Sequence, residues 1–112
     1  VASLPLTRSP TRAGAEGARN LNRLGDVQID RALEGLQGWV REGNEICKEY
    51  RFGDFAQAFR FLTGVAFLAH GADHHPEIWN VYNRVRLRLS THDAGGLTAR
   101  DIELAQAIED FL

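Results

Sequence analysis

The chain has 112 residues and a formal net charge of −2, and its contents of 44% hydrophobic and 25% charged residues are ordinary for one soluble globular domain. Its single cysteine, Cys47, excludes an internal disulfide and a zinc site built on several cysteines. The sequence has no run of about 18 apolar residues, so we expect no membrane-spanning helix.

Residues 1–25 differ in composition from the rest of the chain. They contain four arginines and one glutamate, a net charge of +3, so the remainder carries −5 to give the total of −2. They lack an apolar stripe, and we predict a flexible extension before a single domain over residues 26–112. We expect a cytoplasmic protein. An Arg-rich, acid-poor segment is also typical of organellar transit peptides, and the location would be organellar if residues 1–25 are part of such a peptide. The acidic remainder argues against direct nucleic-acid binding, which depends on phosphate neutralisation.

Residues 26–52 predict a short helix followed by a β-hairpin. Asp26 can cap a helix that extends to about residue 37, and Gly38 ends it. The apolar side of this helix consists of Ile29, Leu33 and Leu36. Residues 39–42 then indicate a strand, Gly43-Asn44 a tight turn, and residues 45–52 a second strand with alternating side chains.

Residues 54–70 predict the longest helix, with Asp54 as its N-terminal cap. Apolar residues at helical spacing predict its buried stripe, which consists of Phe55, Ala58, Phe59, Leu62 and Ala66, widened by Phe61, Val65 and Leu68. Pro76 prevents further helix. Residues 77–82 and 84–92 then indicate two strands, joined by a turn at Tyr82-Asn83.

The alternation in residues 84–92 assigns two faces to the last strand. Val85, Leu87, Leu89 and Thr91 would point to the helices, and Arg84, Arg86, Arg88, Ser90 and His92 would form a polar face. Thr98 and Asp101 form a predicted capping box before a final helix over residues 99–112. The predicted class is therefore α+β, with a four-stranded antiparallel sheet, helices packed on one face, and the order α-β-β-α-β-β-α.

All four histidines lie between residues 70 and 92, and three hypotheses follow from this cluster. His70 and His74 have the i, i+4 spacing of metal ligands, which Asp73 and His92 could complete, but Gly71 and Pro76 end the helix there and no HExxH motif is present. Alternatively, imidazoles with pKa values of about 6.5 could exchange protons with one small substrate, as dehydrations and tautomerisations require. The third hypothesis is an interaction module in which the histidines are incidental.

The stretch from Asp73 to Ala105 resembles the pterin-4a-carbinolamine dehydratase family (4a-hydroxytetrahydrobiopterin dehydratase). The signature of that family falls on His70, His74, His75, Pro76, Tyr82, His92 and Asp101. The resemblance extends over residues 26–112. It implies that the chain removes water from 4a-hydroxytetrahydropterin to give quinonoid dihydropterin, in tetrahydrobiopterin recycling, without a metal or an organic cofactor.

The resemblance also implies roles for individual residues. The substrate contacts would be Asp73, His74, His75, Ser90, Thr91, His92 and Asp93. His75 would be the principal general acid, and His74 and His92 would be the base and a second proton carrier, in an order that stays open. His70 and Asp101 would support the site from behind these residues, and Asp101 is equally explained by the capping box.

This chain departs from the pattern of the family it resembles at two positions. Many relatives carry an acid at the position of His70, and some carry Trp at the position of Ile78, which Trp79 follows here. Members of the family are typically homodimers or homotetramers. Some animal members are also dimerisation cofactors of a homeodomain transcription factor, which is the alternative function implied for this chain and would use a helical surface.

Overall fold

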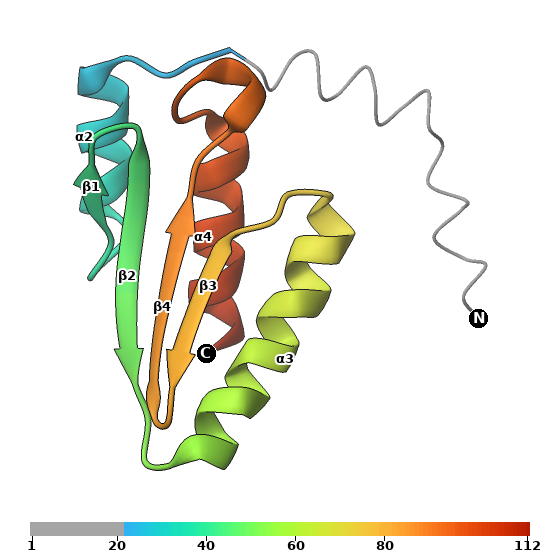
Figure 1. The fold of residues 1–112 in the computed structure, drawn as a ribbon. Coiled ribbons are helices and arrows are strands. Elements are labelled where there is room, and N and C mark those ends of the chain that lie inside the picture. The colour runs from blue at the N-terminus through green and yellow to red at the C-terminus, as the bar shows by residue number, and fades with distance from the viewer. Residues whose placement is uncertain (1–21) are drawn as a thin grey trace, which may run out of the picture.

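The computed structural model describes residues 22–112, so most of the extension predicted for residues 1–25 lies outside the described residues. The observed order of elements confirms the predicted one (Figure 1). The elements are α2 (Asp26–Glu34), β1 (Val40–Glu42), β2 (Glu45–Arg51), α3 (Phe55–Ala72), β3 (Glu77–Val81), β4 (Arg84–Leu89), the short 3-10 helix η2 (His92–Ala94) and α4 (Ala99–Phe111).

The four strands form one antiparallel sheet in the order β1-β2-β4-β3, which confirms the predicted class. The register pairs Ile46 with Leu89 and sets Leu87 between Lys48 and Ile78. Ile46, Val85, Leu87 and Leu89 are fully buried, because alternate residues of each strand point to the face that the helices cover (Figure 1). A slip of one residue would expose this apolar row, so the hydrophobic pattern fixes the register.

The long helix α3 begins as predicted but buries only part of the predicted stripe. Asp54 is its N-cap and accepts a hydrogen bond from the backbone N–H of Gln57 at 2.8 Å. The buried residues are Ala58, Phe61, Leu62, Val65 and Ala69. The predicted stripe was therefore wrong at Phe55, Phe59 and Ala66, which are exposed. No helix within residues 22–112 is long and apolar enough to cross a membrane.

The reason for this difference lies in the contact between α3 and α4. The helix α3 is apolar on most of its circumference, so periodicity alone does not select the side that packs inward. The ring of Phe111 on α4 lies against Gly64, where an added Cβ would approach the ring to 2.0 Å. Gly64 therefore lets α4 approach, and that approach decides which side of α3 is covered.

Three predicted boundaries were also wrong. The helix α2 has Gly25, not Asp26, as its N-cap, and it ends at Gly35 rather than Gly38. The strand β4 ends at Leu89, so His92 does not lie on a strand face but begins η2. The chain leaves the sheet here because Thr91 forms an isolated bridge with Gly96 and its side chain donates a hydrogen bond to Asp101.

The segment before α2 joins the domain through Leu24, whose N–H donates to the carbonyl of Leu97 at 2.8 Å.

A polar cluster fixes the C-terminal half of α4 to the sheet. The Glu109 carboxylate accepts hydrogen bonds from Trp39 Nε1 at 3.1 Å, Lys48 Nζ at 2.9 Å and the Tyr50 hydroxyl at 2.6 Å. Burial alone would raise the pKa of Glu109, but the three donors outweigh burial and lower it. Since this end of α4 is anchored, the position of its first turn, which carries Arg100 and Asp101, is also constrained.

Candidate active site

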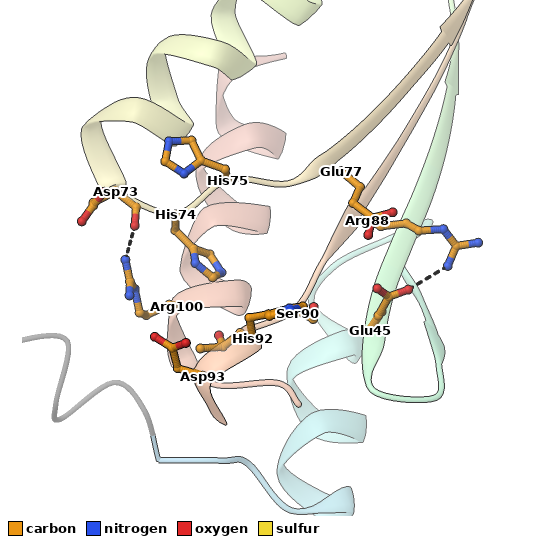
Figure 2. A pocket seen from close by; sticks show the side chains of 11 residues that line it. Glu45, Asp73, His74, His75, Glu77, Arg88, Ser90, His92, Asp93 and Arg100 are labelled. Atoms are coloured by element: carbon orange, nitrogen blue, oxygen red, sulfur yellow. Dashed lines mark hydrogen bonds and ion pairs between the residues drawn. The ribbon is translucent and has the colours of Figure 1, made fainter. Parts of the chain in front are cut away.

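A polar hollow of about 350 Å³ opens where α3, β4 and α4 meet, and we call it the histidine hollow. All seven residues predicted to contact a substrate line it (Figure 2). They are Asp73, His74, His75, Ser90, Thr91, His92 and Asp93. Sequence reasoning did not assign Glu45, Glu77, Arg88 and Arg100 to a site, and these residues also line the hollow. His70 lies outside its lining, on the exposed side of α3, and the supporting role given to it stays a prediction.

The turn that ends α3 directs His74 and His75 into this hollow. Asp73 adopts the left-handed conformation (φ 52°, ψ 44°), and its N–H donates to the carbonyl of His70 at 3.1 Å. The N–H of His74 donates to the carbonyl of Ala69 at the same distance, which closes the helix end. This turn buries His74 to 9% exposure and leaves the neighbouring His75 exposed. The two adjacent histidines therefore have different environments.

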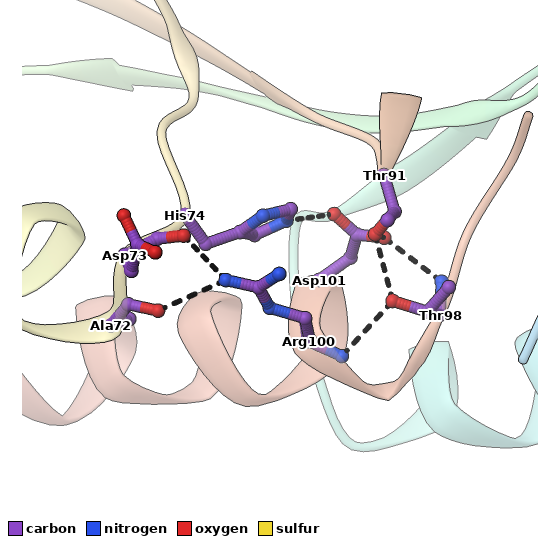
Figure 3. Close-up of polar contacts among 7 residues, drawn as sticks. All are labelled: Ala72, Asp73, His74, Thr91, Thr98, Arg100 and Asp101. Carbon is purple, nitrogen blue, oxygen red and sulfur yellow. Dashed lines mark hydrogen bonds and ion pairs between the residues drawn. The ribbon is translucent and has the colours of Figure 1, made fainter. Parts of the chain in front are cut away.

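Asp101 is fully buried and holds the ring of His74 (Figure 3). Its Oδ1 lies 2.6 Å from His74 Nε2. Its Oδ2 accepts hydrogen bonds from Thr91 Oγ1 at 2.8 Å and from the N–H of Thr98 at 2.9 Å. The bond to Thr98 confirms the predicted capping box. The same carboxylate thus caps α4 and orients a histidine, so the two explanations given for Asp101 are compatible.

The hydroxyl groups beside Asp101 have a determined direction of donation. Thr91 uses its single proton on the carboxylate, so its oxygen must accept at the 2.7 Å contact with Thr98 Oγ1. Thr98 Oγ1 in turn accepts from the N–H of Arg100 at 3.2 Å. The buried Asp101 therefore has its hydrogen-bonding capacity satisfied, since Thr91 and Thr98 both donate to its Oδ2. Among residues 22–112, no buried side-chain nitrogen or oxygen lacks a partner.

Arg100 connects the first turn of α4 to the C-terminal end of α3. Its Nη2 donates to the carbonyl of Ala72 at 3.2 Å and to the carbonyl of Asp73 (Figure 3). The last carbonyls of a helix have no partner within it, and a cation there also complements the helix dipole. Residues 73–76, between α3 and β3, form the histidine loop. Two consecutive residues of α4 hold this loop, since Arg100 binds its backbone and Asp101 binds the His74 ring.

Charged residues at the outer side of the histidine hollow form an ion-pair group. Arg88 Nη1 lies 2.9 Å from Glu42 Oε1 and 3.1 Å from Glu45 Oε1. The hydrogen bond with Glu42 raises the pKa of Arg88, and the same bond lowers the pKa of Glu42. Arg88 stands on the polar face of β4 as predicted. Its place in a site was missed because β1 and β2 bring these carboxylates from more than 40 residues away in the sequence.

The metal hypothesis depended on His70 and His74 lying on one continuous helix. The helix ends at Ala72, between the two, and the left-handed Asp73 follows. His74 Nε2 is also engaged by Asp101. Within residues 22–112, no group of three or more His, Cys, Asp or Glu side chains is arranged to hold a metal ion.

The fold and the hollow define a small α+β protein with a polar site lined by three histidines. Comparison with known proteins identifies the family within this class. The family described as "Pterin 4 alpha carbinolamine dehydratase" matches residues 22–111. The chain belongs to this family, as its motif from His74 to Asp101 predicted.

Individual relatives agree with this assignment. Two of them are each named as a candidate pterin-4-alpha-carbinolamine dehydratase. The protein of Roseiflexus sp. (strain RS-1) is 47% identical, and the match covers 80% of this chain and 97% of that protein. The protein of Novosphingobium aromaticivorans is 49% identical, and the match covers 80% of this chain and 96% of that protein. A crystal structure of a transcriptional coactivator/pterin dehydratase from Brucella melitensis has a TM-score of 0.77 and 38% identity, and the match covers 80% of this chain and 97% of that one. A pterin dehydratase-like RuBisCO assembly factor shares the fold, with a TM-score of 0.57 at 23% identity.

Proposed function

We propose that the chain dehydrates 4a-hydroxytetrahydropterins, including 4a-hydroxytetrahydrobiopterin, to quinonoid dihydropterins in tetrahydrobiopterin recycling. The observation that carries this proposal is the grouping of His74, His75 and His92 around one hollow, with His74 oriented by the buried carboxylate of Asp101. Family membership supports a pterin as the substrate. The proposal needs no metal or organic cofactor, and a cytoplasmic location stays a prediction.

The reaction requires two proton transfers and no nucleophile. One proton is delivered to the 4a-hydroxyl group, which leaves as water when its bond to C4a breaks. The other proton is removed from N5, whose electron pair forms the N5–C4a double bond. We assign the first transfer to His75 and the second to His74 or His92, because all three line the same hollow.

The contact with Asp101 supports His74 as the proton acceptor. An ionised carboxylate only accepts hydrogen bonds, so the Nε2 that it contacts carries a proton. In the neutral ring, Nδ1 then holds the free electron pair and can act as a base. Asp101 also stabilises the imidazolium that forms after proton uptake. His92, which is exposed and begins η2, is the remaining candidate for the second proton carrier.

The function is tested by mixing the purified protein with a freshly generated 4a-carbinolamine in a stopped-flow spectrometer. We expect the absorbance of quinonoid dihydropterin to appear faster in proportion to protein concentration. A rate equal to that of the buffer, at several pH values around neutrality, would reject the dehydratase proposal.

Replacement of Arg100 by Gln should lower kcat by about ten- to a hundredfold, because the loop that carries His74 and His75 loses its backbone contacts and small misplacements of catalytic groups are costly. KM should change less than kcat. Arg100→Lys keeps the positive charge and a donor group that can reach a carbonyl, so it should recover part of the loss. Stopped-flow kinetics and thermal denaturation of both variants check this, and a Gln variant with reduced stability but normal kcat would assign Arg100 to folding alone.

A second candidate function is protein–protein interaction. The solvent-exposed face of α3 includes Phe55, Phe59 and Phe67, at 47%, 53% and 73% exposure, and the rings of Phe55 and Phe59 lie against each other. Three exposed phenylalanines on one helix are unusual for a free surface. We propose that this face pairs with other copies in a homodimer or homotetramer. A transcription-factor partner would use the same face, and the coactivator named among the structural relatives supports this alternative.

Phe59→Glu should reduce the assembly to a smaller species, because a charge would be buried in the proposed interface. Multi-angle light scattering measures the mass directly. Val27→Glu is the matched control, since it makes the same kind of change at a 71% exposed position of α2 and should keep the wild-type mass. A monomeric wild type would exclude self-assembly. In that case a pull-down with homeodomain dimerisation helices would test the partner alternative.

A further inference from the structure

A second hollow of about 400 Å³ lies beside the histidine hollow, and we call it the hairpin hollow. The two hollows share part of their lining, namely Glu45, Ser90, Thr91 and His92. The rest of the hairpin hollow is lined by Glu42 and Asn44, at the turn between β1 and β2, and by Gly95 and Gly96, in the loop after η2. A ligand at the histidines can therefore extend across His92 into the hairpin hollow.

The lining of the hairpin hollow combines hydrogen-bond acceptors with a donor. Glu42 and Glu45 supply carboxylate oxygens, and Arg88 forms an ion pair with each of them. Asn44 Oδ1 accepts a hydrogen bond from Arg23 Nη2 at 3.2 Å, which leaves the amide NH₂ group of Asn44 to donate toward a ligand. Hydroxyl groups both donate and accept, so they match this lining.

The chemistry of the proposed reaction decides which part of a pterin would occupy each hollow. The atoms that react, C4a and N5, must lie near His74, His75 and His92, and only the histidine hollow is lined by all three among the described residues. Position C6 is bonded directly to N5 and carries the substituent of natural pterins. A substituent at C6 therefore starts beside the reacting edge, close to the wall that both hollows share.

We propose that the hairpin hollow is a subsite for a hydroxylated C6 substituent and that it makes the enzyme selective for such pterins. This inference rests on the proposed dehydratase function. The bicyclic ring occupies the histidine hollow, and the hydroxyl groups of the substituent donate to Glu42 or Glu45 and accept from Asn44. Binding energy at this distance from C4a improves the positioning of the ring without taking part in the proton transfers.

The test compares two substrates in two variants. The substrates are the 4a-carbinolamines of a dihydroxypropyl-substituted pterin and of a 6-methyl pterin, which lacks the hydroxyl groups. Asn44→Phe fills the hairpin hollow, and Glu42→Gln removes a charge without adding bulk while Arg88 keeps its ion pair with Glu45. Both positions are exposed, and neither lines the histidine hollow. We expect Asn44→Phe to raise KM for the hydroxylated substrate by about tenfold, and Glu42→Gln to raise it by a smaller factor. The kcat/KM for the 6-methyl substrate should stay within about twofold of the wild type in both.

The possible outcomes separate this subsite from the catalytic proposal. If a variant lowers turnover of both substrates equally, the hairpin hollow holds the ring or supports the fold, and the subsite is rejected. If neither variant affects either substrate, the hollow takes no part in binding, and the subsite is again rejected while the dehydratase function stands. If the wild type turns over neither substrate, the dehydratase function itself fails, and the subsite fails with it.

Discussion

Asp101→Asn should lower the dehydration rate by at least about a hundredfold while the protein stays folded. An asparagine amide has one acceptor and one donor arm, whereas both oxygens of Asp101 accept hydrogen bonds. An NH₂ group cannot face the N–H of Thr98, so the amide oxygen takes that side and the NH₂ group faces His74. Nε2 of His74 must then accept, its proton moves to Nδ1, and the ring loses the electron pair assigned to proton removal.

Two measurements distinguish this loss of orientation from a general loss of structure. Stopped-flow kinetics gives the rate, and the ¹⁵N chemical shifts of the His74 ring report which nitrogen is protonated. Asp110→Asn, an exposed change at the other end of α4, is the matched control and should leave both unchanged. Asp101→Ala should in addition destabilise the fold by about 3–5 kcal/mol, because buried groups lose a charged partner. A fully active Asn variant would contradict the role assigned to Asp101.

His75→Ala should lower dehydration by about two orders of magnitude or more, since the departing hydroxyl group would lose its proton donor. His75 lines the hollow and is exposed, and no hydrogen bond or ion pair to its ring is formed by residues 22–112. Its removal should therefore cost little stability. The initial rate of quinonoid dihydropterin formation measures the effect, and thermal denaturation verifies the fold.

His75→Gln is the comparison that isolates proton transfer. Glutamine retains polarity and hydrogen-bonding capacity but does not titrate near neutrality. We expect it to be nearly as slow as the Ala variant. If the Gln variant keeps the wild-type rate, His75 only binds the substrate, and the proton donor must be sought at His92. Unchanged turnover in the Ala variant would remove His75 from the site altogether.

Local sequence signals predicted most of the fold correctly. Asp54 caps α3 and Thr98 forms a capping box with Asp101 because these bonds join residues three positions apart, so their spacing is visible in the sequence. The alternation of Val85, Leu87 and Leu89 likewise predicted the buried face of β4. The predicted end of this strand was wrong, because the bridge between Thr91 and Gly96 and the bonds of Thr91 to α4 depend on tertiary contacts.

The histidine cluster was visible in the sequence by itself, and the family motif selected His74, His75 and His92 from it. The sequence determined which residue types could move protons and where the helix before them ends. Only the tertiary structure decided their surroundings, because α4 approaches the histidine loop from 27 residues away, so that Asp101 contacts His74 and Arg100 contacts the backbone of Asp73. Periodicity describes the face of one element, whereas the hydrogen bonding and position of His74 depend on a neighbouring element that packing alone brings into contact.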